Sequence, residues 1–137
     1  MPSKDSHLQT ARDNRATCLL LLDSDPQSQA WATTIAFYCA LHLVEAALAV
    51  EGRHSEDHMV RNMHLKTTRK LQNIWRNYKP LYDNSLKARY LTTDSDSAET
   101  LVREFLGEDK VREKIIGHYL RQVEKSVAKI IGEDSIF

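Results

Sequence analysis

The chain has 137 residues, of which 42% are hydrophobic and 28% are charged, and its formal net charge is zero. This composition excludes a disordered or fibrous protein, and the length fits a single domain that buries its own core. Four glycines and three prolines are too few for the many turns of a β-sandwich or β-barrel, so we expect an all-α fold.

Apolar periodicity predicts a single-domain, up-and-down bundle of five or six helices over residues 1–137. In chain order, the predicted helices cover residues 4–22, 26–50, 55–78, 80–91, 97–106 and 108–131. We expect Gly52 to end the second helix and Pro80 to open the fourth, because glycine favours helix ends and proline favours first turns. The core should cover about residues 4–131, with residues 132–137 frayed.

The segment Trp31–Val50 is long and apolar enough to resemble a membrane span. It carries His42 and Glu45, however, and an ionised carboxylate inside a bilayer is costly. We therefore interpret it as the central core helix and expect no membrane association. The first residues lack the apolar run of a signal peptide, and Cys18 and Cys39 lie in apolar stretches, so we expect a cytoplasmic protein.

Several common catalytic motifs are absent from the sequence. It has no glycine-rich phosphate loop, no CxxC pair, no HExxH and no GxSxG, which argues against P-loop enzymes, zinc ribbons and serine hydrolases. Charge is unevenly distributed, because residues 53–89 hold nine Lys or Arg against three acids. Such a basic segment can meet phosphates, or it can be neutralised within the fold or across a dimer.

The predicted second helix carries three polar residues, Tyr38, His42 and Glu45, on one side. A buried Glu45 needs a cation nearby, whether the group serves packing or lines a site. The candidate partners are Arg15, Arg61 and Arg89.

Histidines gather just after this helix. His54 and His58 are four residues apart, as zinc ligands on one helix face can be, but His54 is expected in the turn after Gly52. We therefore expect neither a metal site nor a cofactor.

A third group lies on the face that Tyr78, Tyr82, Ser85 and Arg89 share. Arginine with tyrosine suits phosphate binding and base stacking, and it equally suits a dimer surface. The spacing alone leaves both interpretations open.

Two runs, FYCALHLVEAALAVEGRHSEDHMVRN and YKPLYDNSLKARYL, resemble the HEPN superfamily (higher eukaryotes and prokaryotes nucleotide-binding). The resemblance covers about Leu8 to Leu91. It implies a small, usually dimeric all-α bundle. Many HEPN domains are metal-independent ribonucleases of toxin–antitoxin, defence or RNA-processing systems, and others only bind nucleotides or RNA.

The family's catalytic signature is an arginine, a polar residue and a histidine, with four to six residues between the arginine and the histidine. Where many members have that arginine, this chain has Ser85, and no histidine follows within reach. Two other places imitate the signature: Arg53 to His58 has four residues between, whereas Arg61 to His64 has the Arg-Asn start but only two residues before the histidine. The resemblance therefore implies catalytic candidates at His58, Arg61 and His64. It also implies a ligand-binding group at Arg53, Tyr82, Ser85, Arg89 and Tyr90, with Tyr38, His42 and Glu45 as the supporting network.

From this pattern we expect a homodimeric HEPN-like module that binds RNA or a nucleotide with weak or no catalysis. It would be the partner of another protein in a toxin–antitoxin or defence system. The alternatives are an active metal-independent endoribonuclease and a purely structural protein-interaction module.

Overall fold

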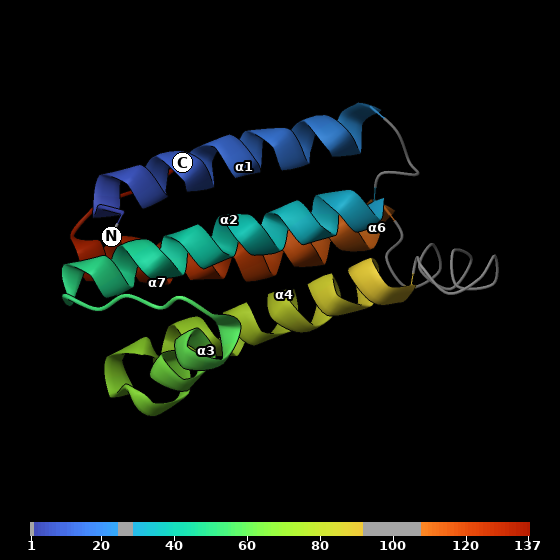
Figure 1. Cartoon of the computed structure of the whole chain (residues 1–137). Coiled ribbons are helices and arrows are strands. Elements are labelled where there is room, and N and C mark those ends of the chain that lie inside the picture. Colours follow the sequence, from blue (N-terminus) through green and yellow to red (C-terminus); the bar gives the residue numbers. More distant parts are fainter. Residues whose placement is uncertain (1, 25–28, 92–107) are drawn as a thin grey trace.

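The computed structural model describes residues 2–24, 29–91 and 108–137, and all regular structure in these ranges is helical (Figure 1). The elements are α1 (Lys4–Ser24), α2 (Gln29–Val50), α3 (His58–Thr67), η2 (Arg69–Leu71), α4 (Gln72–Leu91), α6 (Glu108–Lys110), η3 (Val111–Leu120) and α7 (Arg121–Ile131). The prediction of an all-α helical bundle is confirmed. The helix predicted at 97–106 lies outside the described residues.

Helix α2 is the centre of the bundle. It packs against α1, α4, η3 and α7, and the long helices alternate in direction along the chain (Figure 1). By length and composition α2 could cross a membrane, but 72% of its most apolar window is buried inside the structure. Its role as a core helix explains why it is apolar nearly all round.

Within the described ranges, helices α1 and α2 form the most extensive helix pair. The buried stripe of α1 comprises Leu8, Ala11, Cys18 and Leu22. The Cys18 thiol donates to the carbonyl oxygen of Ala32 at 3.2 Å, and the Cys39 thiol donates to that of Ala11 at the same distance. The two thiols therefore act as small core groups that join the helices reciprocally.

The chain turns sharply after α2, as the glycine there predicts. Gly52 has a φ of 70°, and the backbone N–H of Arg53 donates to the carbonyl oxygen of Leu48 at 2.8 Å. A side chain would disfavour this left-handed conformation, which glycine adopts readily. The expected end of the second helix is confirmed.

The predicted boundary between the third and fourth helices is wrong. Helix α3 ends at Thr67, Thr68 is extended, and Pro80 lies inside α4 instead of opening it. Because the helix continues regularly across Pro80, one apolar stripe packs against α2. The free energy gained by burying this stripe outweighs the loss of the backbone hydrogen bond that proline cannot donate. The buried stripe of α4 comprises Ile74, Tyr78, Leu81, Ser85 and Ala88.

The C-terminal helix spans 108–131 as predicted, but η3 within it is wound as a π-helix. Gly117 in η3 lets the wider backbone close, because a Cβ there would lie 2.8 Å from the carbonyl oxygen of Arg112. Helix α7 ends at Gly132, whose φ is 80°.

The expectation of a frayed end at residues 132–137 is wrong. Ile136 is only 4% exposed, and its backbone N–H donates to a carboxylate oxygen of Glu124 at 2.8 Å. Its carbonyl oxygen accepts from Arg12 Nε at 2.9 Å. The segment after α7 is therefore fastened to both α1 and α7, because an apolar side chain four residues after Gly132 finds a place in the core.

Candidate functional site

The candidate site begins where the loop after α2 enters α3. Asp57 caps α3, and its carboxylate accepts the backbone N–H of Val60 at 2.8 Å. This cap makes His58 the first helical residue and brings His58 and Arg61, three residues apart, onto neighbouring positions of one helix face.

A buried ion pair between Glu45 on α2 and Arg61 on α3 lies at the base of the site. Arg61 Nε is 2.7 Å from Glu45 Oε1, and the two residues are 5% and 2% exposed. The second guanidinium nitrogen of Arg61 donates to the carbonyl oxygen of Ser55 at 3.4 Å, and the N–H of Ser55 donates to Glu45 Oε2 at 3.5 Å. Because each buried charge has its partner, the pair fixes the loop and α3 against α2.

His58 is held between this guanidinium and two aromatic rings. Its Nδ1 atom lies 3.1 Å from Arg61 Nη1, and its ring centroid is 5.7 Å from that of Phe37 and 5.6 Å from that of Tyr82. Arginine can only donate a hydrogen bond, so Nδ1 is the acceptor and the ring proton belongs on Nε2.

The surroundings of His58 keep its imidazole neutral. Burial lowers the pKa of His58, and the positive charges of Arg61 and Arg89 lower it further, while Asp57 acts in the opposite direction. The neutral ring, with its outer nitrogen protonated, can stack on a planar group or exchange a proton at neutral pH.

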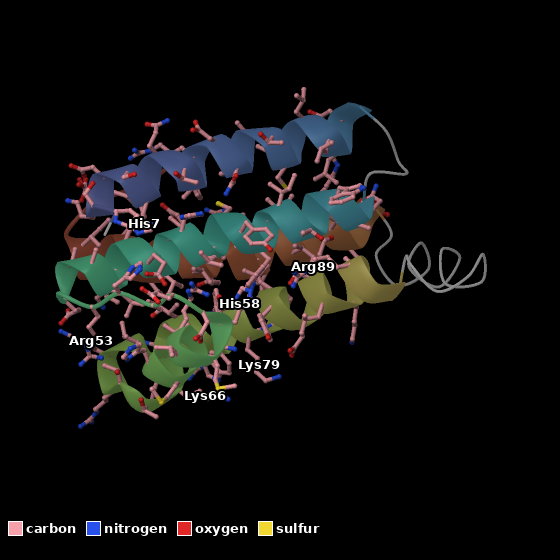
Figure 2. All side chains as sticks on the ribbon, in the orientation of Figure 1. His7, Arg53, His58, Lys66, Lys79 and Arg89 are labelled. Carbon is pink, nitrogen blue, oxygen red and sulfur yellow. The ribbon has the colours of Figure 1, made fainter. Side chains whose placement is uncertain are left out.

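Arg89 on α4 approaches the same seam from the other side. Its Nη1 atom donates to the hydroxyl of Tyr38 at 3.4 Å, and Figure 2 shows Arg89 and His58 along the side of α4 that faces α2. Ser85 is fully buried, and its hydroxyl donates to the carbonyl oxygen of Tyr82 at 2.8 Å. The partly exposed side chains of Tyr82 and Arg89, together with His58, are thus the ones that a ligand can reach.

No protein-family profile, curated protein or solved structure matches the chain.

The predicted polar stripe of α2 divides among three partners instead of forming one network. Tyr38 accepts from Arg89, His42 Nδ1 lies 3.1 Å from His7 Nδ1, and Glu45 pairs with Arg61. Of the three cations expected for Glu45, Arg61 is the partner. Arg15 instead lies over the ring of Phe137, with its guanidinium carbon 4.7 Å from the ring centroid.

Not all of the predicted ligand-binding residues converge. Arg53 donates to the hydroxyl of Thr68 at 3.0 Å, and Figure 2 shows it far along the molecule from Arg89. His64 follows His58 by about one and two-thirds helical turns, so the two side chains leave α3 in different directions. Tyr90 belongs to α4, but its side chain lies outside the described part of the chain.

Sequence reasoning did not identify His7 or Phe37 as parts of this region. His7 is 6% exposed and meets His42 across the α1–α2 interface, and burial lowers the pKa of both rings. Phe37 packs its ring against Tyr38, His58, Tyr78 and Tyr82. Both residues have the pattern of ordinary core positions, so no local signal separates them from the rest of the core.

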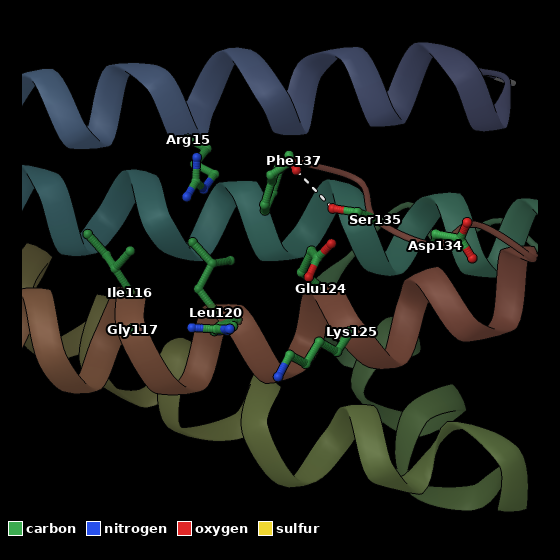
Figure 3. A pocket seen from close by; sticks show the side chains of 10 residues that line it. Arg15, Ile116, Gly117, Leu120, Glu124, Lys125, Asp134, Ser135 and Phe137 are labelled. Atoms are coloured by element: carbon green, nitrogen blue, oxygen red, sulfur yellow. Dashed lines mark hydrogen bonds between the residues drawn. The ribbon is translucent and has the colours of Figure 1, made fainter.

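A separate pocket of about 390 Å³ lies between α1, the C-terminal helix and the last residues (Figure 3). Its lining mixes basic Arg15 and Lys125 with acidic Glu124 and Asp134. Glu124 holds the backbone of Ile136, so one of these acidic groups already has a structural task. The pocket therefore borders the contacts that hold the C-terminal residues.

Proposed function

We propose that the chain is a HEPN-like module that binds RNA or a nucleotide at His58, Tyr82 and Arg89, with weak or no catalysis. The observation that carries this proposal is the position of the neutral His58 ring between Tyr82 and the Arg61 guanidinium, with the positive charge of Arg89 close enough to lower its pKa. Aromatic rings beside guanidinium groups bind bases and phosphates.

Each side chain then has a distinct task. Arg89 contacts a phosphate, and Tyr82 and His58 present rings to a base. Arg61 is a positioning residue, because its nitrogens already bind Glu45, Ser55 and His58 and its side chain is buried. Glu45 neutralises Arg61, so the contact with the phosphate is assigned to Arg89 on α4.

The small number of acid–base groups at this site is the reason that we expect weak catalysis. Cleavage of RNA by acid–base chemistry requires one group to take a proton and another to return it. His58 supplies one titratable group beside Arg61 and Arg89, and His64 leaves α3 in a different direction. As a HEPN-like module of this kind, the chain would act as the partner component of a toxin–antitoxin or defence system.

The second candidate, an active metal-independent endoribonuclease, is favoured by the pKa of His58. Burial and two neighbouring guanidinium groups lower that pKa, which keeps the ring in the form that accepts a proton at neutral pH. A general base beside a phosphate-binding arginine supplies two of the groups that such an enzyme requires.

A homodimer is supported by two exposed methionines beside the site. Met59 and Met63 are 81% and 52% exposed and lie four residues apart on α3, so they form one apolar strip. A second copy of the chain would cover this apolar strip. Light scattering should give the mass of a dimer, and Met63→Glu should reduce it to that of a monomer.

The test of binding uses fluorescence anisotropy with a labelled single-stranded RNA pool and with a labelled nucleotide, in buffer with EDTA. Arg89→Ala should weaken binding by about 1.5–3 kcal/mol, or roughly 10-fold to 150-fold, because it removes a charged hydrogen-bond donor to the phosphate. Lys79→Ala is the matched control, because Lys79 lies on the same helix in an exposed pair with Asp83 and should leave binding unchanged. Circular dichroism verifies that both variants keep their fold.

Three outcomes separate the candidate functions. RNA cleavage by the wild type that His58→Ala abolishes would favour the endoribonuclease. Binding without cleavage, lost in Arg89→Ala, supports the proposed module. If the wild type neither binds nor cleaves, the proposal is refuted in favour of a structural protein-interaction module.

A further inference from the structure

A second group of polar side chains lies on the α1 side of Glu45. His7 from α1, Glu45 from α2 and His54 from the following loop each bring one ligand atom within 4.8 Å of the other two. Helix α1, helix α2 and the loop after α2 thus bring two imidazole nitrogens and one carboxylate oxygen to the same place.

We propose that His7, Glu45 and His54 bind one Zn²⁺ ion. Two histidines with one carboxylate are a ligand set that zinc takes in proteins, with a fourth position open to water. Two imidazoles also favour zinc and its first-row neighbours over Mg²⁺ and Ca²⁺, which prefer oxygen ligands. The spacing of His54 and His58 in the sequence suggests a different pair of ligands. In the structure His58 contacts Arg61 and Tyr82, so the proposed site uses His54 without His58.

The two oxygens of Glu45 divide between separate tasks. Oε1 accepts from Arg61 at 2.7 Å, whereas Oε2 faces His54 Nδ1 at 3.7 Å. Ligand atoms on a tetrahedral zinc ion stand about 3.3 Å apart, so the His54–Glu45 edge needs only a small closure. Arg61 holds the Glu45 carboxylate in one orientation through Oε1, and Oε2 of Glu45 stays directed at the proposed site.

The surroundings supply the supporting contacts that metal sites have. His42 Nδ1 lies 3.1 Å from His7 Nδ1 and fixes the orientation of the His7 ring, which makes His42 a positioning residue. Ser55 is 3% exposed, and its hydroxyl has no hydrogen-bond partner within the described ranges. A water on the ion would give this buried hydroxyl a partner, since Ser55 also contacts Glu45 Oε2 through its backbone.

Access to the site is through His54. The side chain of His54 is 31% exposed, whereas Glu45 and His7 are buried, so an ion enters from the loop side. His54 can rotate onto the ion without disturbing the core. The site does not depend on the RNA-binding proposal, because it uses none of His58, Tyr82 or Arg89.

The experiment is calorimetric titration of the full chain with Zn²⁺ after removal of metals with EDTA. The wild type should bind one ion per chain, and His54→Gln and His7→Gln should each weaken binding by at least about tenfold. His118→Gln is the matched control, because it removes an exposed histidine on η3, and it should bind like the wild type. In a parallel titration, Co²⁺ should give the visible absorption of a four-coordinate site.

His54→Gln should keep the fold, because His54 is exposed. If His7→Gln proves to be destabilised, the zinc affinity of His54→Gln alone tests the proposal. Absence of one-to-one binding would overturn the proposal. Equal affinities for the wild type, His54→Gln and His118→Gln would overturn it as well, because they would indicate an adventitious ion only.

Discussion

His7 on α1 and His42 on α2 meet through their Nδ1 atoms, which are 3.1 Å apart. One of the two nitrogens must carry a proton and the other must lack one, because two N–H groups would repel each other. The two rings are also stacked at a tilt, with centroids 5.4 Å apart. The contact therefore requires at least one neutral imidazole inside the α1–α2 interface.

Acidification should destabilise the fold. Burial is the main reason that the pKa values of His7, His42 and His58 are lowered, so below about pH 6.5 the unfolded chain binds more protons than the native one. The free energy of unfolding should be fully present above that pH and fall as the pH drops. Urea unfolding between about pH 5 and pH 8, with EDTA present, measures this slope.

His42→Gln should make the free energy of unfolding depend less on pH. It removes one of the two titrating rings, and it removes the contact in which a protonated His7 would face a second imidazole. His118→Gln, at an exposed position, should leave the slope as in the wild type. A free energy of unfolding that rises on acidification would contradict this account.

Glu45→Gln should cost about 3–5 kcal/mol of stability, because it leaves the buried Arg61 guanidinium without its counter-charge. The matched control is Asp83→Asn, which removes the partner of Lys79 in an exposed pair and should cost less than about 0.5 kcal/mol. Urea unfolding gives both values. If the two variants lose equal amounts of unfolding free energy, the buried pair contributes no more to stability than the exposed one.

Ile136→Ala should destabilise the chain by about 2–4 kcal/mol, because Ile136 is 4% exposed and its removal leaves a cavity in the core. Phe137→Ala should cost only about 0.5–1 kcal/mol, since Phe137 is 38% exposed and mainly loses its contact with Arg15. Thermal unfolding compares the two. If Ile136→Ala melts like the wild type, the segment after α7 contributes nothing to the core.

Gly117→Ala should destabilise the chain by about 1–3 kcal/mol, although alanine usually favours a helix. The added Cβ would lie 2.8 Å from the carbonyl oxygen of Arg112, so the π-helical turn would have to open. The neighbouring exposed His118→Ala should change stability by no more than about 0.5 kcal/mol. An increase in melting temperature for Gly117→Ala would mean that the backbone there can rewind as an ordinary α-helix.

Local pattern predicts much of this fold. Apolar stripes identify α1 and the C-terminal helix, and a long apolar run identifies α2. Gly52 marks the end of α2 because glycine readily adopts the left-handed conformation found there. The boundary near Pro80 is not predictable in this way. It depends on whether one continuous stripe packs on α2, which is a property of the assembled bundle.

The candidate site was predictable only in part. The need of Glu45 for a cation follows from its place in an apolar helix, but the choice of Arg61 over Arg15 and Arg89 depends on the path of the loop at residues 51–57. His7 carries no local signal at all, since its partner His42 is 35 residues away in the chain. Contacts of this kind come from the packing of helices and not from the spacing of residues.

The pairing of α1 with α2 has a consequence for how the chain folds. These two helices are consecutive in the sequence, and they form the most extensive helix pair in the described part of the bundle. Their association brings together residues that are close in the sequence and loses little chain entropy, whereas docking of α7 on α2 must bring together residues far apart in the chain. We therefore expect the α1–α2 hairpin to form early and to serve as the template on which the later helices assemble.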